Sequence, residues 1–139
     1  GTISNMGCTT VAQSGATTVS DTTAKTLFVI PAGSQILSIT VDITTAYAGT
    51  TGNTITIKAG STTLGTVGGA TTTPLAVGRA TFTITDANIA TWVNVGTSDV
   101  LITATYACAG VASGGAATVT VNYVVRNSDG GQYQTTFNN

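Results

Sequence analysis

Apolar and polar residues alternate along much of the chain, and this alternation is typical of β-strands that turn one face towards a core. The clearest case is segment 35–45, in which the residues expected to point inwards are Leu37, Ile39, Val41 and Ile43. The side chains between them are Ser, Thr and Asp, which we expect to face water. The outward face of this strand is therefore polar but almost free of charge.

The same alternation recurs in other segments, which are separated by stretches rich in Gly, Ser, Thr and Ala. We expect further strands at 26–30, 54–59, 62–67, 78–85, 99–107 and 117–126, with weaker signals at 7–11 and 15–19. Pro31-Ala32-Gly33 ends one strand, and Gly60-Ser61 has the composition of a tight hairpin turn. Segment 68–78 has no period and is expected to form a long loop.

One segment has the pattern of a single helical turn. Thr85 or Asp86 would cap its start, and Ile89 and Trp92 would pack inwards. No other segment favours a helix, so the chain is expected to be built almost entirely from strands.

The many short strands and the Gly-rich turns between them predict an all-β domain. The expected fold is a two-sheet β-sandwich of jelly-roll or Greek-key type, with extended N- and C-terminal arms. The sandwich would occupy residues 21–126. Residues 1–20 would form an N-terminal arm or edge strands, and residues 127–139, which lack alternation, would form a C-terminal tail.

Composition supports strands and argues against nucleic acid as a partner. Threonine makes up nearly a quarter of the chain, and β-branched residues fit a pleated sheet. Charged residues make up 6% of the chain, against about 25% in an average soluble domain. The charges are scattered and sum to −1, so the basic stripe of a nucleic-acid-binding protein is missing.

We expect neither a membrane helix nor a signal peptide in this sequence. No apolar run approaches the roughly 18 residues of a membrane helix. The first residues lack the basic and apolar regions of a signal peptide. We therefore expect the protein to have no membrane partner and to act where it is made, or to be packaged from there.

The residues that common catalytic sites need are largely absent. With no His and no Glu, neither a Ser-His-Asp triad nor a Cys-His pair can be built. The aspartates have the sequence context of turns, caps and a polar strand face, at Asp21, Asp86, Asp99, Asp129 and Asp42. Asp86-Ala87-Asn88 matches two ligands of a calcium loop without the rest of that motif, and no phosphate-loop motif is present. We expect no catalytic residue, no metal, no cofactor and no enzymatic activity.

The two cysteines, Cys8 and Cys108, lie far apart in the sequence. Two small, buried thiols are the simpler interpretation. A disulfide between them is the alternative, and it would stabilise the fold by about 4 kcal/mol. Without histidine, two cysteines do not supply the ligands of a zinc site.

The aromatic residues differ in their surroundings. Trp92 lies among apolar residues and is expected in the core. Tyr47 follows a strand and would either close the end of the sandwich or be exposed at a loop. Tyr133 and Phe137 lie in the tail, which has no core of its own, so they would fold back on their own domain or dock in a neighbouring subunit. We favour the neighbour.

The expected exterior of Thr, Ser, Asn and Gly suits contact with other proteins. Net charge keeps soluble monomers apart, and this chain has almost none. Hydroxyl side chains can form hydrogen bonds and are easier to desolvate than Lys or Glu, which interfaces deplete. We therefore expect a structural subunit that functions within an assembly.

Three segments carry a resemblance to a known group of proteins: "LFVIPAGSQILSITVDITTAY", "NTITIKAGSTTLGTV" and "ATVTVNYVVRNSDG". Together they resemble small all-β structural proteins of tailed bacteriophages, including phages of marine and cyanobacterial hosts. The shared features are an early strand ending in I-P-A-G, a next strand with V-D-I-T-T-A, and a last strand of the V-x-V-x-Y-V type. The resemblance spans roughly residues 26–126 and brings no functional residues with it.

The resemblance implies a virion protein made in the host cytoplasm, present as symmetric or quasi-symmetric copies and without catalytic activity. The leading hypothesis is a capsid decoration (cement) protein, a homo-oligomer whose partners are the major capsid protein and copies of itself. Partner contacts are expected at Tyr133, Phe137, Arg126 and Tyr47. One alternative is a tail, fibre or connector subunit. Another is a carbohydrate-binding adhesive sandwich with stacking platforms at Tyr47, Trp92 or Tyr133.

Overall fold

The computed structural model describes residues 9–69, 75–82, 86–110 and 112–125, which form eight strands and one short helix. The strands are β1 (Thr9–Thr18), β2 (Lys25–Ile30), β3 (Gln35–Thr45), β4 (Thr51–Ala59), β5 (Thr62–Gly68), β6 (Gly78–Phe82), β7 (Val100–Ala109) and β8 (Ala116–Val125). A 3₁₀ turn, η1 (Asp86–Asn88), leads into α1 (Ile89–Val93) between β6 and β7. Strands were predicted at all eight of these places.

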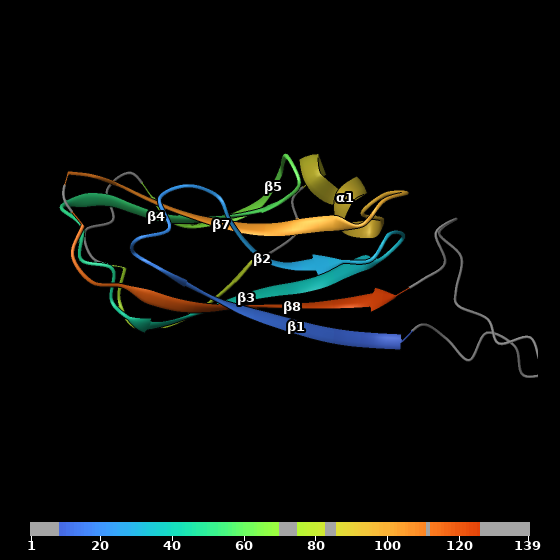
Figure 1. The fold of residues 1–139 in the computed structure, drawn as a ribbon, viewed down its shortest axis with the longest axis horizontal. Helices are drawn as coiled ribbons and strands as arrows, with labels where there is room; N and C mark the ends of the chain where they lie inside the picture. The colour runs from blue at the N-terminus through green and yellow to red at the C-terminus, as the bar shows by residue number, and fades with distance from the viewer. Residues whose placement is uncertain (1–8, 70–74, 83–85, 111, 126–139) are drawn as a thin grey trace, which may run out of the picture.

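The strands form two four-stranded antiparallel sheets that face each other (Figure 1). We call the sheet with strand order β1-β8-β3-β6 sheet A and the sheet with order β2-β7-β4-β5 sheet B. The pairs β1–β8, β2–β7, β3–β6 and β4–β5 are nested, so the chain is one long hairpin rolled into two layers. This arrangement is a jelly roll. It confirms the predicted two-sheet sandwich and selects the first of the two topologies considered.

The core lies between the sheets, where the central strands supply every second side chain. The innermost of these side chains include Ile39, Val41, Val119 and Val121 from sheet A and Ile55, Ile57, Ile102 and Ala104 from sheet B. The residues that alternate with them are mostly Thr, Ser and Asn and point away from the core. The apolar periodicity of the sequence therefore positions the polar outer faces as well as the core.

The start of β3 departs from the predicted alternation. Ile36 pairs with Tyr123 and Ser38 pairs with Asn122, so Leu37 is an extra residue that forms a β-bulge. The bulge turns Leu37 outwards, where its side chain is 44% exposed, and Ile36 is buried instead. The prediction that Leu37 points inwards is therefore wrong, because counting in steps of two fails across an inserted residue.

The predicted helical turn is present as η1 and α1, at the end of the sandwich that we call the α1 end (Figure 1). Trp92 is buried, as predicted, and α1 packs against β3. Ile89 is 42% exposed, so its predicted inward orientation is wrong. A five-residue helix makes little more than one turn, and only one of its side chains is buried in the core. Thr85, one of the two predicted caps, lies outside the described residues.

β1 belongs to the sandwich, and this moves the predicted domain boundary. The two weak strand signals at the start of the sequence are parts of a single strand, which pairs with β8 over its whole length. The described part of segment 1–20 is therefore an edge strand and not an arm, and the sandwich starts well before residue 21. Residues 1–8 and the predicted tail 127–139 lie outside the described residues.

The two sheets also contact each other along both long sides. On one side, the Gln13 amide of β1 donates a hydrogen bond to the Val29 carbonyl of β2 at 2.7 Å. On the other side, the Phe82 ring of β6 packs against Gly65 of β5, where a Cβ would lie 2.6 Å from the ring. β1, β2, β5 and β6 remain the edge strands of the two sheets.

Cys108 is a free thiol that is only partly buried. Cys108 therefore takes part in no disulfide. Cys8 lies outside the described residues.

Candidate functional site

The outer face of sheet A carries hydroxyl side chains that line up across the strands. The register places them side by side in one row that crosses all four strands: Ser14, Thr120, Thr40 and Thr81. Neighbouring strands are about 4.8 Å apart, so the row is roughly 14 Å long. Every member is half-buried or exposed. The row offers donors and acceptors to a partner without any formal charge.

The outer face of sheet B has a similar arrangement. One row consists of Thr66, Thr56 and Thr105, and the next consists of Thr63, Lys58, Thr103 and Thr26. Five of these seven residues line a shallow groove of about 410 Å³ on this face. Lys58 is the one charged residue in the two rows. Next to them, Val29 pairs with Leu101, and both side chains are exposed.

The charged residues on the outer face of sheet A neutralise each other. Asp42 of β3 lies opposite Arg79 of β6, with Arg79 Nε donating at 2.6 Å and Nη2 at 3.2 Å. The hydrogen bond from Arg79 lowers the pKa of Asp42, and the same pairing raises the pKa of Arg79. Both groups therefore stay ionised and paired across the ordinary pH range. The described part of this face presents almost no net charge.

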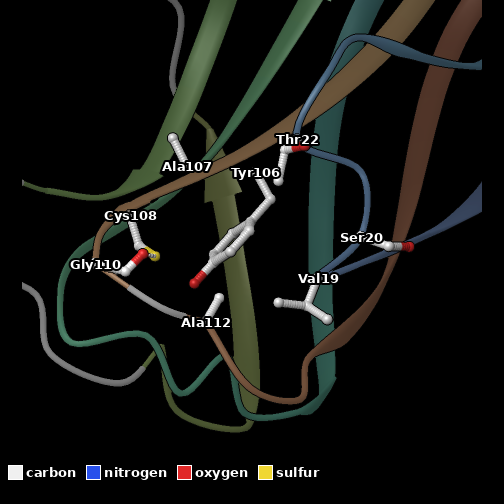
Figure 2. A pocket seen from close by; sticks show the side chains of 8 residues that line it. All are labelled: Val19, Ser20, Thr22, Tyr106, Ala107, Cys108, Gly110 and Ala112. Carbon is white, nitrogen blue, oxygen red and sulfur yellow. Dashed lines mark hydrogen bonds between the residues drawn. The ribbon is translucent and has the colours of Figure 1, made fainter.

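An open cavity of about 530 Å³ lies at the opposite end of the sandwich, which we call the Tyr47 end. Figure 2 shows the ring of Tyr106 pointing between Val19, Ala112 and Cys108. The remaining lining residues are Ser20, Thr22, Ala107 and Gly110. Small apolar groups and hydroxyls cover its walls. The Cys108 thiol donates a hydrogen bond to the Gly110 carbonyl at 3.5 Å. None of the described lining residues is charged.

A buried polar network lies behind this cavity. The Tyr106 hydroxyl donates to Asn53 Oδ1, which also accepts from the Gly49 amide at 3.0 Å. The Tyr47 ring lies 4.8 Å from the Tyr106 ring, and its hydroxyl donates to the Thr17 carbonyl at 3.2 Å. Burial, with a contribution from the negative charge of Asp21, raises the pKa of Tyr47 to about 12. The network is therefore neutral and acts as a structural closure.

Tyr47 is consequently not a partner contact, and that prediction is wrong. Its side chain is fully buried, and its backbone pairs with Leu75 through two hydrogen bonds of 3.0 Å. Of the two alternatives for Tyr47, it closes the end of the sandwich. The other predicted contacts, Arg126, Tyr133 and Phe137, lie outside the described residues.

The buried tyrosines and tryptophan bear on carbohydrate binding. Stacking on a sugar needs an aromatic ring open to solvent. Within the described residues, the Trp and Tyr side chains are all at most 3% exposed: Tyr47, Trp92, Tyr106 and Tyr123. Tyr47 and Trp92 are therefore not stacking platforms, which removes two of the three residues on which the carbohydrate hypothesis depended.

Asp21 and Asp99 lie in turns and loops, as expected, and accept hydrogen bonds there. The Asp21 carboxylate accepts from the Thr17 hydroxyl and the Thr18 amide, both at 2.8 Å, and so fixes the turn after β1. Asp99 accepts from the Ala32 amide at 2.9 Å and ties two loops together. Within the described residues, no three His, Cys, Asp or Glu side chains gather as metal ligands would. In the same part of the chain, no helix is long and apolar enough to cross a membrane.

Comparison with known proteins does not assign the chain to a family. No protein-family model matches the sequence, and no curated protein is significantly similar to it.

The hydroxyl rows were not predicted from the sequence. The repeated T-x-T pattern in strands such as 54–56, 103–105 and 118–120 signals one polar face on each strand. Aligning these faces into rows depends on strand order and register, because the members of the sheet A row come from positions as distant as Ser14 and Thr120. Local periodicity contains no information on such pairings.

Proposed function

We propose that this protein is a structural component of a virus particle, most specifically a capsid decoration protein that stabilises the shell by binding between major capsid subunits. The observation that carries the proposal is the row of uncharged hydroxyl side chains across sheet A, repeated in two rows on sheet B. Partner copies and capsid subunits would bury these faces.

The physical argument concerns the cost of desolvation. Burying a charged side chain without a partner costs far more than burying a hydroxyl that finds a hydrogen-bond partner. Thr side chains are also stiff, so ordering them at an interface costs little conformational entropy. A face built from Thr and Ser can therefore be covered over a large area, and a small contribution per copy is multiplied across a lattice.

The architecture supports the same proposal by analogy. Jelly rolls occur in viral capsid proteins, and they also occur in lectins and other proteins, so the fold alone does not assign function. The lectin analogy is weakened here because the described Trp and Tyr side chains are buried.

The two ends of the described body lie side by side, because Thr9 and Val125 are register partners at the α1 end. In the proposed function Arg126, Tyr133 and Phe137 contact neighbouring subunits. These contacts add to those of the faces.

The experiment measures incorporation into the parent virus particle. We expect many copies per shell for the unaltered protein, and an at least tenfold loss of affinity (about 1.4 kcal/mol) for the double variant Thr40→Lys with Thr120→Lys. The double variant Thr56→Lys with Thr105→Lys tests sheet B in the same way. The matched control is Thr22→Lys with Thr23→Lys, which adds the same charge in an exposed turn at the Tyr47 end, away from all three rows and from the α1 end.

The outcomes separate the hypotheses. Absence of the protein from the particle rejects a virion function, and a few copies confined to the tail support the tail, fibre or connector alternative. Full incorporation of both face variants shows that neither hydroxyl face is the binding surface.

A further inference from the structure

β1 differs from the central strands in what it supplies to the core. Its inward positions are occupied by Val11, Gln13, Gly15 and Thr17. Of these four, only Val11 has an apolar side chain, because Gly15 has no side chain and Gln13 and Thr17 are polar. The facing positions on β8 are occupied by Tyr123, Val121, Val119 and Ala117, which are all buried. β1 therefore covers the core without contributing much to it.

Hydrogen bonds, more than apolar packing, hold β1 in place. It pairs with one strand, β8, along all ten of its residues. The Gln13 amide donates to the Tyr123 hydroxyl and to the Val29 carbonyl, both at 2.7 Å. Lys25 Nζ donates to the Ala16 carbonyl at 3.0 Å. The groups to which β1 bonds, on Tyr123, Val29 and Lys25, all lie outside β1. A β1 strand from a second copy would therefore form the same hydrogen bonds.

Segment 19–24, which joins β1 to β2, has the properties of a hinge. When extended it spans about 20 Å, which is enough to carry β1 to an adjacent molecule. Short connecting loops favour exchange of the element that they hold. β8 cannot exchange in this way without disrupting sheet A, because it lies between β1 and β3.

We propose that β1 exchanges between copies of this protein, so that β1 of one molecule pairs with β8 of its neighbour. Exchange re-forms the β1–β8 pair and the hydrogen bonds of Gln13. Its cost is opening the turn that Asp21 fixes through Thr17 and Thr18, together with bringing two molecules together. Neighbours in an assembly are already held at high effective concentration, which favours exchange further. The proposal rests on the proposed function for its place in a particle, but exchange itself is measurable in the purified protein.

A pair of introduced cysteines distinguishes the two arrangements. Ser14 and Thr120 are register partners on the outer face, and both are replaced by cysteine in a chain that also carries Cys8→Ala and Cys108→Ala. Oxidation then joins β1 to β8 within one chain, or between two chains if β1 has exchanged. We expect the share of covalent dimers and larger species on a non-reducing gel to rise at least about threefold between micromolar and millimolar protein.

The control places the same bond between strands that do not exchange. Thr40→Cys with Thr120→Cys uses the same β8 position but joins it to β3, a central strand with chain on both sides. Its disulfide is expected to stay within one chain at every concentration. This pair also measures cross-linking by random collision.

The proposal is overturned if the β1–β8 pair gives the same intramolecular product as the β3–β8 pair at every concentration. If the first pair impairs folding, Ala16→Cys with Thr118→Cys repeats the test at another register pair. The gel reports only on chain connections in purified protein. Its failure therefore leaves particle incorporation untested, and a failure of incorporation does not affect the gel.

Discussion

Gly49 lies where three polar side chains converge at the Tyr47 end. A Cβ at this position would approach Asn53 Oδ1, the Tyr106 hydroxyl at 2.7 Å and Cys108 Sγ at 2.8 Å. The absence of a side chain is what allows the network between Asn53 and Tyr106 to close. At the scale of single residues, a glycine therefore determines how this end of the sandwich is sealed.

Gly49→Ala is expected to lower the free energy of unfolding by about 1–3 kcal/mol, because overpacking displaces hydrogen-bonded neighbours. Urea denaturation measures the change. Ala48→Ser, at the exposed neighbouring position, should stay within about 0.5 kcal/mol of the unaltered protein. Equal stability of the two variants would contradict the described packing.

Asp21 gives the turn after β1 a pH dependence. Burial raises its pKa, but the hydrogen bonds from Thr18 and Thr17 and the nearby Lys25 outweigh burial, so the pKa lies below its ordinary value of 3.8. A carboxyl with a lowered folded-state pKa stabilises the fold above its unfolded-state pKa. That stability is lost as the pH falls below about 3.8 through the folded-state pKa.

Asp21→Asn should therefore cost about 1–2 kcal/mol of unfolding free energy at neutral pH, since charged hydrogen bonds are lost. The difference from the unaltered protein should shrink as the pH falls below about 3.8. Urea denaturation at a series of pH values measures both. A constant difference down to pH 2 would show that the ionised carboxylate is not what stabilises the turn.

Among the elements, β3 shows where sequence periodicity succeeds and where it fails. Beyond the bulge, its inward positions are those predicted, because an uninterrupted strand alternates strictly. At the bulge, one inserted residue exchanges the roles of Ile36 and Leu37. The bulge depends on pairing with β8, which is distant in sequence, so no local pattern reveals it.

Ile36→Ala should lower the free energy of unfolding by about 2–5 kcal/mol, because it leaves a cavity in the core. Leu37→Ala removes a side chain of the same size from the surface and should change stability by less than about 0.5 kcal/mol. Thermal or urea denaturation of the two variants checks this order. The reverse order would restore the alternation predicted from the sequence.

Of the two strands that pair with β8, β1 is expected to be less stable than β3. Its inward positions bury little apolar surface, whereas β3 buries several Ile and Val side chains. Amides of β1 that bond to β8 should therefore exchange with deuterium at least about tenfold faster than those of β3 that bond to β8. Hydrogen exchange followed by NMR measures both sets, and equal protection would show that β1 opens only with the whole domain.

For the whole molecule, the sequence was sufficient for fold class but not for strand order. The central strands were predictable because Ile and Val recur at every second position. The nesting of the strand pairs, and with it the hydroxyl rows, depends on pairings across the full length of the chain. Tyr47 illustrates the same limit, because its burial depends on Leu75 and on the end of β1, both distant in sequence.

Association through the hydroxyl face of sheet A should depend little on salt. Screening weakens interactions between charges over about 10 Å at 0.1 M salt, and the hydroxyl row on sheet A contains no charged residue. We expect self-association, or binding to a capsid shell, to change less than about threefold between ~0.05 and ~0.5 M salt. Sedimentation velocity measures this, and a steep decline with salt would indicate an electrostatic interface.

The nested hairpin also sets the order in which the protein can fold during synthesis. Among the described strands, β1 is synthesised first and its partner β8 last. Until β8 has been made, at about 5–20 residues per second, β1 lacks the strand with which it pairs. A neighbouring nascent or newly released chain could supply one, so crowded polysomes are where the earliest joined subunits should be found.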